Sequence, residues 1–135
     1  MFSMIITIIA IALVAALALA TLYYGSQYYR DGQAKAAAAK AIQQGNQITG
    51  ALEVFRADKG ALPTGTNEEI KQSLLDNKYL SSWPAASWEL RDDYVVRTDL
   101  DQKACLMVNQ SLKIDTIPAC DDAAYAGKSY CCQSN

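Results

Sequence analysis

The sequence predicts an α+β protein. A long N-terminal α-helix, apolar in its outer half and amphipathic in its inner half, is expected to pack on a small antiparallel β-sheet, with a C-terminal disulfide-bounded loop. Three observations predict this class. Residues 1–29 contain no charge, apolar residues at helical spacing continue far beyond them, and all four cysteines lie in the final quarter of the chain. An uncharged segment is therefore joined to one small water-soluble domain.

Charge is distributed unevenly along the 135 residues. The chain has 12 Lys and Arg against 14 Asp and Glu, no histidine and a net charge of −2, and every charged residue lies at or after Arg30. The acidic balance argues against nucleic acid as the main partner, because phosphate binding needs a concentrated basic surface. The absence of histidine removes the commonest general base and every Ser-His or Cys-His nucleophile pair. We therefore expect no enzyme activity, no catalytic residue and no cofactor.

The uncharged residues 1–29, called the apolar segment below, predict a hydrophobic helix over residues 1–30. A helix over residues 1–24 is roughly 36 Å long, enough to cross a hydrocarbon core of about 30 Å. The alternative is a cleaved secretory signal, for which Ala18-Leu19-Ala20 offers a small-residue site. Such signals carry a basic leading region, which is missing here, and a shorter apolar run. A transmembrane helix is therefore the preferred interpretation.

Four tyrosines close the apolar segment: Tyr23, Tyr24, Tyr28 and Tyr29. Tyrosine is amphipathic and collects where membrane meets water, so these side chains predict an interfacial belt. The alternative interpretation is aromatic packing between subunits of an assembly.

A second helical pattern begins at Ala34. Its apolar or small residues are spaced alternately by four and three, which places them on one helix face, and polar residues fill the positions between them. The members of this seam are Ala34, Ala38, Ala41, Gly45, Ile48, Leu52 and Phe55. Gly60 and Pro63 predict that the helix ends near Lys59. One nearly continuous helix of roughly 85 Å is expected, and its outer half must be buried in lipid or in copies of itself.

The rest of the chain, residues 31–135, is expected to form a globular head domain. It divides into an amphipathic helix half, a loop with a short helix, and a sheet with the disulfide region, at 31–59, 60–86 and 87–135. The capping-box pair Thr66 and Glu69 marks the start of the short helix. Alternating or β-rich stretches predict strands at 88–90, 94–98 and 105–112.

The cysteines are Cys105, Cys120, Cys131 and Cys132. Without a C-x-x-C motif or a histidine they argue against a zinc site, and we expect no metal and two disulfides formed in an oxidising compartment. Three pairings exist. A bond between adjacent cysteines would be strained, so Cys105 and Cys120 are each expected to pair with one member of Cys131-Cys132. A Cys105–Cys131 bridge would close a loop of about 27 residues and contribute roughly 3–4 kcal/mol.

These features together resemble the type IV pilins and pseudopilins. The resemblance covers the architecture of the whole chain, and its specific parts are the start at Met1-Phe2, the stretch GALEVFRADKGALP at 50–63, and Tyr79-Leu80 with Trp83-Pro84. Cys105 with the later cysteines is similar to the bracket around the family's C-terminal loop. The chain departs from the family at Ile5, where the family usually has a glutamate that is thought to neutralise a neighbour's terminal amine. The family's helix-softening proline is also absent near Leu22.

The resemblance implies a structural subunit of a type IV pilus-like helical filament that polymerises through its N-terminal helix. It implies removal of a short leader by prepilin peptidase and methylation of the new N-terminal residue, Met1. Since Ile5 supplies no charge, the amine must be methylated, solvated or paired otherwise. The partners implied are further copies of the chain, the membrane before assembly, and the pilus assembly machinery. The filament core would contain Ile5, Ile8, Ile9, Leu13, Leu17, Tyr24 and Tyr28.

The location implied is the bacterial inner membrane before assembly and an extracellular filament, or fimbrium, at the cell surface afterwards. Filaments of this architecture serve adhesion, conjugation, DNA uptake and twitching. The alternative function is a monomeric, single-pass membrane-anchored periplasmic binding module. In that case the seam from Ala34 to Phe55 would merely pack on the chain's own sheet.

Overall fold

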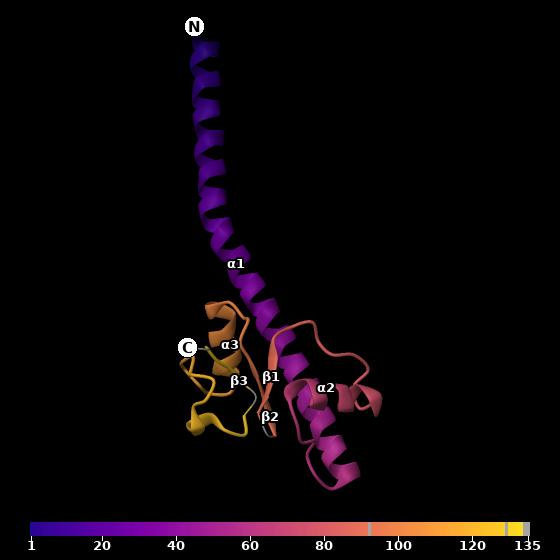
Figure 1. The fold of residues 1–135 in the computed structure, drawn as a ribbon. Coiled ribbons are helices and arrows are strands. Elements are labelled where there is room, and N and C mark those ends of the chain that lie inside the picture. Colours follow the sequence, from indigo (N-terminus) through magenta and orange to yellow (C-terminus); the bar gives the residue numbers. More distant parts are fainter. Residues whose placement is uncertain (92, 129, 134–135) are drawn as a thin grey trace. The chain divides into compact units, whose positions relative to one another are not determined.

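A computed structural model of the chain describes residues 1–91, 93–128 and 130–133. The fold is α+β, as predicted. Its elements in chain order are α1 (Phe2–Lys59), α2 (Asn67–Asp76), β1 (Trp88–Arg91), β2 (Tyr94–Arg97), α3 (Gln102–Ser111), the 3₁₀ helix η1 (Ala123–Tyr125) and β3 (Tyr130–Cys131) (Figure 1). The chain divides into two units, Met1–Gln33 and Ala34–Asn135, of which the second is called the folded unit below.

The helix α1 runs through 58 residues without interruption and contributes to both units. Its sequence contains no proline, and alanine and other good helix formers dominate it. The helix ends as the glycine signal predicted: Gly60 adopts a left-handed φ of 78°, and its N–H donates to the Arg56 carbonyl at 2.9 Å. A residue with a Cβ would be strained at this cap. The expected single long helix is therefore confirmed.

The predicted capping box starts α2. The Thr66 backbone N–H donates to Oε2 of Glu69 at 2.8 Å, and the Glu69 N–H donates to the Thr66 hydroxyl oxygen at 3.4 Å. Two hydrogen bonds to the Glu69 carboxylate, the one from the Thr66 backbone N–H and a weaker one from the Thr66 hydroxyl at 3.1 Å, hold the pKa of the Glu69 carboxyl below its ordinary value. These bonds satisfy N–H groups that a helix start otherwise leaves unpaired.

The sheet is mixed, with strand order β1-β2-β3, which corrects the expected antiparallel sheet. The strands β1 and β2 are antiparallel, with Leu90 opposite Val95, but β3 is parallel to β2, with Tyr130 beside Val96. A two-residue strand such as β3 carries no alternation that a sequence pattern can detect.

The strand expected at 105–112 is wrong, because this stretch forms α3. Asp101 caps the helix by accepting a hydrogen bond from the Lys103 N–H at 3.2 Å. The residues that α3 buries, Ala104, Cys105, Val108 and Asn109, repeat at intervals of three and four, which is the helical period. Alternation over five residues was therefore a weaker signal than the spacing of the side chains that need burial.

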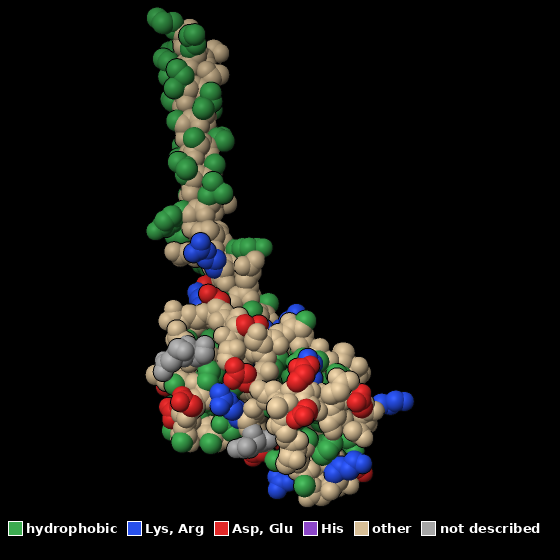
Figure 2. Space-filling view, viewed as in Figure 1, with side chains coloured by type: hydrophobic (Ala, Val, Ile, Leu, Met, Phe, Trp, Pro, Cys, Tyr) green, Lys and Arg blue, Asp and Glu red, His purple; other side chains and the backbone are tan. Residues whose placement is uncertain are grey.

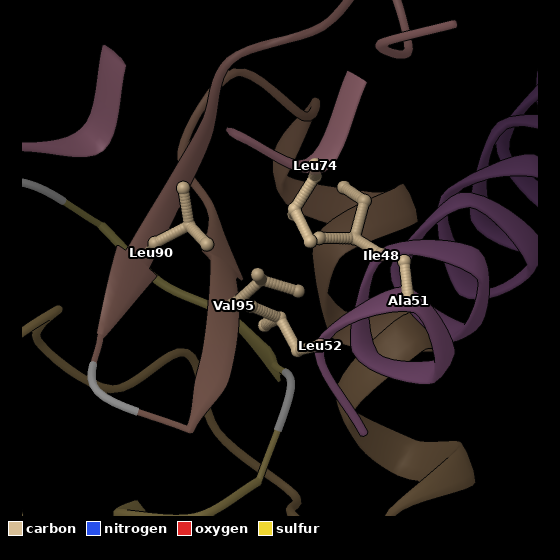
Figure 3. Close-up of a cluster of buried hydrophobic side chains, with 6 residues drawn as sticks. All are labelled: Ile48, Ala51, Leu52, Leu74, Leu90 and Val95. Carbon is tan, nitrogen blue, oxygen red and sulfur yellow. The ribbon is translucent and has the colours of Figure 1, made fainter. Parts of the chain in front are cut away.

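Two clusters bury the second half of α1 within the folded unit. In the first, Ile48, Ala51 and Leu52 of α1 face Leu74 of α2 together with Leu90 and Val95 of the sheet (Figure 3). In the second, the short side chains of Ala38 and Ala41 contact α3 and β3 through Cys105, Val108 and Cys131. A further cluster, formed by Val96, Ile114, Cys120, Tyr130 and Cys132, fills the C-terminal region.

Candidate assembly surface on the first helix

The apolar segment buries none of its side chains. Every residue from Met1 to Arg30 is exposed, and hydrophobic side chains follow the visible face of the helix (Figure 2). From Phe2 to Leu22 the large apolar side chains are 53–84% exposed. The predicted filament-core residues all lie on this surface: Ile5, Ile8, Ile9, Leu13, Leu17, Tyr24 and Tyr28.

Three hydroxyl groups of the apolar segment donate to carbonyl groups of the helix itself. Thr7 donates to the Met4 carbonyl at 2.8 Å, Thr21 to the Leu17 carbonyl at 2.7 Å, and Ser26 to the Tyr23 carbonyl at 3.1 Å. Such bonds to the preceding turn let hydroxyl side chains enter an apolar environment without an unpaired donor. These three residues therefore do not require water around the segment.

The helix is long and apolar enough to cross a membrane, either as an anchor or as a signal. Its most apolar stretch of 18 residues has a mean hydropathy of 2.8, and none of that stretch is buried within the chain. An exposed stretch of this kind differs from the core helix of a water-soluble protein, which its own domain covers. The stretch is therefore not a core helix of its own chain, and it fits either a membrane anchor or a signal.

The tyrosines form an aromatic group at the end of the apolar segment, just before Arg30. The rings of Tyr23 and Tyr24 meet edge to face at a centroid distance of 5.5 Å. Together with Tyr28 and Tyr29 they are 64–78% exposed. Their position fits the belt that tyrosine forms where an apolar phase meets water.

Burial begins at Ala34 and follows the seam. Ala34, Ala38, Ala41, Gly45, Ile48 and Leu52 are buried, and Phe55 is half-buried against the same cluster as Ile48 and Leu52. Ala51 is buried as well, although the seam pattern did not include it. Ala51 follows Ile48 by three positions, so it lies on the same helix face as Ile48 and Leu52. An apolar stripe wider than the seam is therefore the sequence signal that identifies Ala51.

Gly45 lies where α1 closely approaches Trp88 of β1. A Cβ built at Gly45 would lie 3.1 Å from Cη2 of Trp88, tighter than an ordinary contact. Trp88 also contacts Arg97, whose guanidinium lies 5.3 Å from a ring centroid of the indole. Arg97 also donates to Oε1 of Gln44 at 2.8 Å and to Oδ1 of Asp99 at 2.6 Å. This cluster fastens the second half of α1 to β1 and β2.

The charge cluster changes the titration of Asp99. Burial by itself would raise the pKa of the Asp99 carboxyl, but hydrogen bonds from the Arg97 side chain and the Ser87 backbone N–H outweigh it and hold the pKa below its ordinary value. The aspartate is therefore an ionised acceptor near neutral pH, which keeps Arg97 over the indole ring.

Two disulfides close the C-terminal region. Cys105 of α3 bonds Cys131 of β3 with a Cα–Cα distance of 5.3 Å, and Cys120 bonds Cys132 with a distance of 4.9 Å. This is one of the two pairings that the strain argument left open. Both bridges lie in the folded unit and indicate an oxidising compartment.

The side chain of Asn109 is a buried polar link that sequence reasoning missed. Its Oδ1 accepts from the Cys131 N–H at 2.9 Å, and its Nδ2 donates to the Cys131 carbonyl at 2.8 Å and to the Thr116 carbonyl at 2.9 Å. The side chain thus supplies β3 with both hydrogen bonds of a strand neighbour. An asparagine within an apolar helix face was the available signal, because a buried amide needs partners.

The described residues 1–91, 93–128 and 130–133 contain no group of three or more Asp, Glu or Cys side chains placed to hold a metal ion. The expectations of no enzyme activity, no metal and no cofactor stay predictions. No family model, curated protein or solved structure matches the chain.

Proposed function

We propose that the chain is a structural subunit of a type IV pilus-like helical filament that polymerises through α1, with a membrane around the apolar segment before assembly. The observation that carries the proposal is one helix that exposes every residue up to Arg30 and then buries a regular seam from Ala34 onward. Each fully exposed Leu, Ile or Phe gains roughly 1.5–3 kcal/mol when it is buried. The segment therefore needs an apolar environment that its own chain does not supply.

The length of the segment favours copies of the chain as the final environment. A hydrocarbon core requires about 20 apolar residues of helix, and the uncharged stretch extends over residues 1–29. The additional turns carry the tyrosines, whose rings pack well against neighbouring helices and whose hydroxyls find partners at a wet rim. A bundle of identical helices would bury these turns as well.

The segment also has the composition that close helix packing needs. Ala12, Ala16 and Ala20 are spaced by four and lie along one face, where small side chains let another helix approach closely. Because residues 1–29 are uncharged, bundled copies bring no like-charged side chains together there. Lipid and a helix bundle are thus interchangeable environments for the segment.

Substitution of a charge into the segment tests the proposal. Leu13→Lys places an ammonium near the middle of the uncharged stretch, where it costs about 2.5–3.5 kcal/mol in a bilayer. We expect the number of fibres in sheared surface material, counted by electron microscopy, to fall at least tenfold. Gln43→Lys, an exposed position of the same helix, is the matched control and should leave fibres unchanged.

Sedimentation separates the proposal from the membrane-anchored binding module. A filament subunit is expected to leave large helical particles after mild detergent extraction. A discrete monomer, with no fibres on cells that produce the chain and its assembly machinery, would support the monomeric module and refute the filament. The mass of the N-terminal peptide from the same material tests the expected methyl group on Met1.

A further inference from the structure

A second candidate site lies within the folded unit. An open hollow of about 450 Å³ lies between the first turns of α2 and the loop that leads into β1. Its lining residues are Asn67, Glu68, Lys71, Trp83, Pro84, Ala85, Ala86, Ser87, Trp88 and Leu90. The volume falls in the range of small-molecule sites.

Both tryptophans of the chain line this hollow. Trp83 and Trp88 are half-buried and pack against the cluster around Ile48 and Leu74, so their rings are held from behind. The loop between them is braced by its own backbone, since the Ala86 N–H donates to the Pro84 carbonyl at 2.8 Å and the Trp88 N–H to the Ala86 carbonyl at 3.0 Å. The hollow is thus formed before any ligand arrives.

Polar groups from α2 and the loop stand around the rings. Nζ of Lys71 lies 3.1 Å from Oε1 of Glu68 and 5.8 Å from the centroid of a Trp83 ring. The Glu68 side chain is 76% exposed and that of Lys71 29% exposed. Asn67 and Ser87 are exposed at the edge of the hollow. A carboxylate, an ammonium, a carboxamide and a hydroxyl therefore surround an aromatic surface.

We propose that this hollow binds a neutral pyranoside. A pyranose ring presents a face of weakly positive C–H groups, which packs on the negative face of an indole, while its hydroxyls need both donors and acceptors around the edge. The paired Lys71 and Glu68 supply both without net charge. An anionic ligand would meet Glu68 and a cationic ligand would meet Lys71, so the pair selects an uncharged polar ligand.

The proposal does not depend on filament assembly, because every lining residue belongs to the folded unit. The hollow is compatible with both functions considered above: on a filament it would attach the fibre to glycans, and on a monomer it would be the binding site of the module. Failure of assembly and failure of saccharide binding are therefore separate results.

Tryptophan emission reports the site directly, because the chain has no tryptophan outside the hollow. The full chain in phosphatidylcholine nanodiscs is titrated with cellobiose, chitobiose, maltose and lactose, and iodide quenching is measured at each step. We expect a saturable shift in the millimolar range and reduced quenching with at least one saccharide. A second arm uses nanodiscs that contain a monoglucosyl diacylglycerol, so that a lipid-borne pyranoside is distinguished from a soluble one.

Variants tie the response to the hollow. Trp83→Leu keeps an apolar side chain against the core and should weaken binding at least tenfold, with Trp88 as the remaining reporter. Glu68→Gln should weaken it about three- to tenfold, because a hydrogen bond to a charged group is lost. Asp76→Asn, the same change on α2 outside the hollow, should have no effect. Absence of a saturable response in both arms, or equal binding by wild type and Trp83→Leu, would overturn the proposal.

Discussion

The two halves of α1 show how one helix can meet opposite environments. Ile8 and Ile48 are the same residue type in the same helix, yet Ile8 is 66% exposed and Ile48 is fully buried. The rest of the chain covers only the half that begins at Ala34. Helix formation and helix burial are therefore separate in α1, and the environment of the first half must come from outside the chain.

Side-chain size distinguishes the halves as well. The first half carries large apolar side chains on all sides, as expected for a helix surrounded by lipid or by other helices. The second half has one buried stripe, which contains Gly45 where Trp88 approaches closely. One buried stripe is typical of a helix that packs on the surface of a domain.

Aspartate substitutions at Ile48 and Ile8 should give the largest difference between the two halves of α1. Ile48→Asp buries a carboxylate without a partner and should destabilise the folded unit by at least about 4 kcal/mol, enough to unfold a domain of this size. Ile8→Asp should leave the thermal unfolding of the folded unit unchanged but abolish stable membrane insertion. Near-UV circular dichroism in detergent and flotation with membranes measure the two effects. Unfolding by Ile8→Asp would show that the halves are not independent.

The disulfides should affect the folded unit alone. Replacing Cys105 and Cys131 by serine opens a loop of about 27 residues and should cost roughly 3.5 kcal/mol, whereas replacing Cys120 and Cys132 opens about 13 residues and should cost roughly 3. The midpoint of denaturant unfolding in detergent gives both values. Membrane insertion of either double variant should equal that of the wild type. A larger loss from the shorter loop would contradict the loop-closure argument.

Removal of the buried amide of Asn109 should cause the next largest loss in the free energy of unfolding. Asn109→Ala leaves the Cys131 N–H and two carbonyl groups without their partner, and we expect a loss of about 2–3 kcal/mol in the free energy of unfolding. Gln110→Ala, the exposed neighbour on α3, should change it by less than about 0.5 kcal/mol. Equal effects of the two variants would mean that Asn109 does not hold β3.

The sequence patterns were most informative where they extended over many residues. The seam repeats over seven positions, and six of them are buried while Phe55 is half-buried. The capping box and the glycine cap each depend on a local backbone requirement, and both occur where the residues indicated. Long periodicities and local caps are decided by the segment itself, so they can be read without the tertiary structure.

Features that depend on distant partners escaped prediction. The strand expected over 105–112 was wrong for a local reason instead, because Asp101 caps this stretch and its burial follows the helical period. β3 exists only because Asn109 and β2 supply its hydrogen bonds, and residues 109 and 131 are 22 positions apart. The tryptophan-lined hollow likewise combines α2 with the loop before β1. Such pairs are set by tertiary packing, which one sequence does not display.

Alanine substitutions at Gly45 and Gly25 should show the same contrast between the two halves of α1 with a smaller effect on stability. Gly45→Ala gains about 1 kcal/mol of helix propensity, but its methyl group would lie 3.1 Å from Trp88, whose ring lies under the Arg97 guanidinium. We expect a net loss of about 1 kcal/mol, seen as a lower unfolding temperature. Gly25→Ala has no neighbour within 4 Å and should leave that temperature unchanged. A stabilising Gly45→Ala would show that Trp88 can move away.

The smallest expected effect is a dependence of stability on pH that belongs to the folded unit, because residues 1–29 contain no carboxyl side chain. Since the pKa of Asp99 is lower in the folded than in the unfolded chain, its contribution is fully present above the unfolded value of about 3.9 and is lost as pH falls through the folded value. The side chain is 37% exposed, so solvent screening limits this contribution to less than about 1 kcal/mol. Denaturant unfolding between about pH 2 and pH 6 should therefore show a shallower slope for Asp99→Asn than for the wild type. Asp115→Asn, a change at an exposed carboxylate, should keep the wild-type slope, and a shallower slope there as well would assign the effect to general charge repulsion.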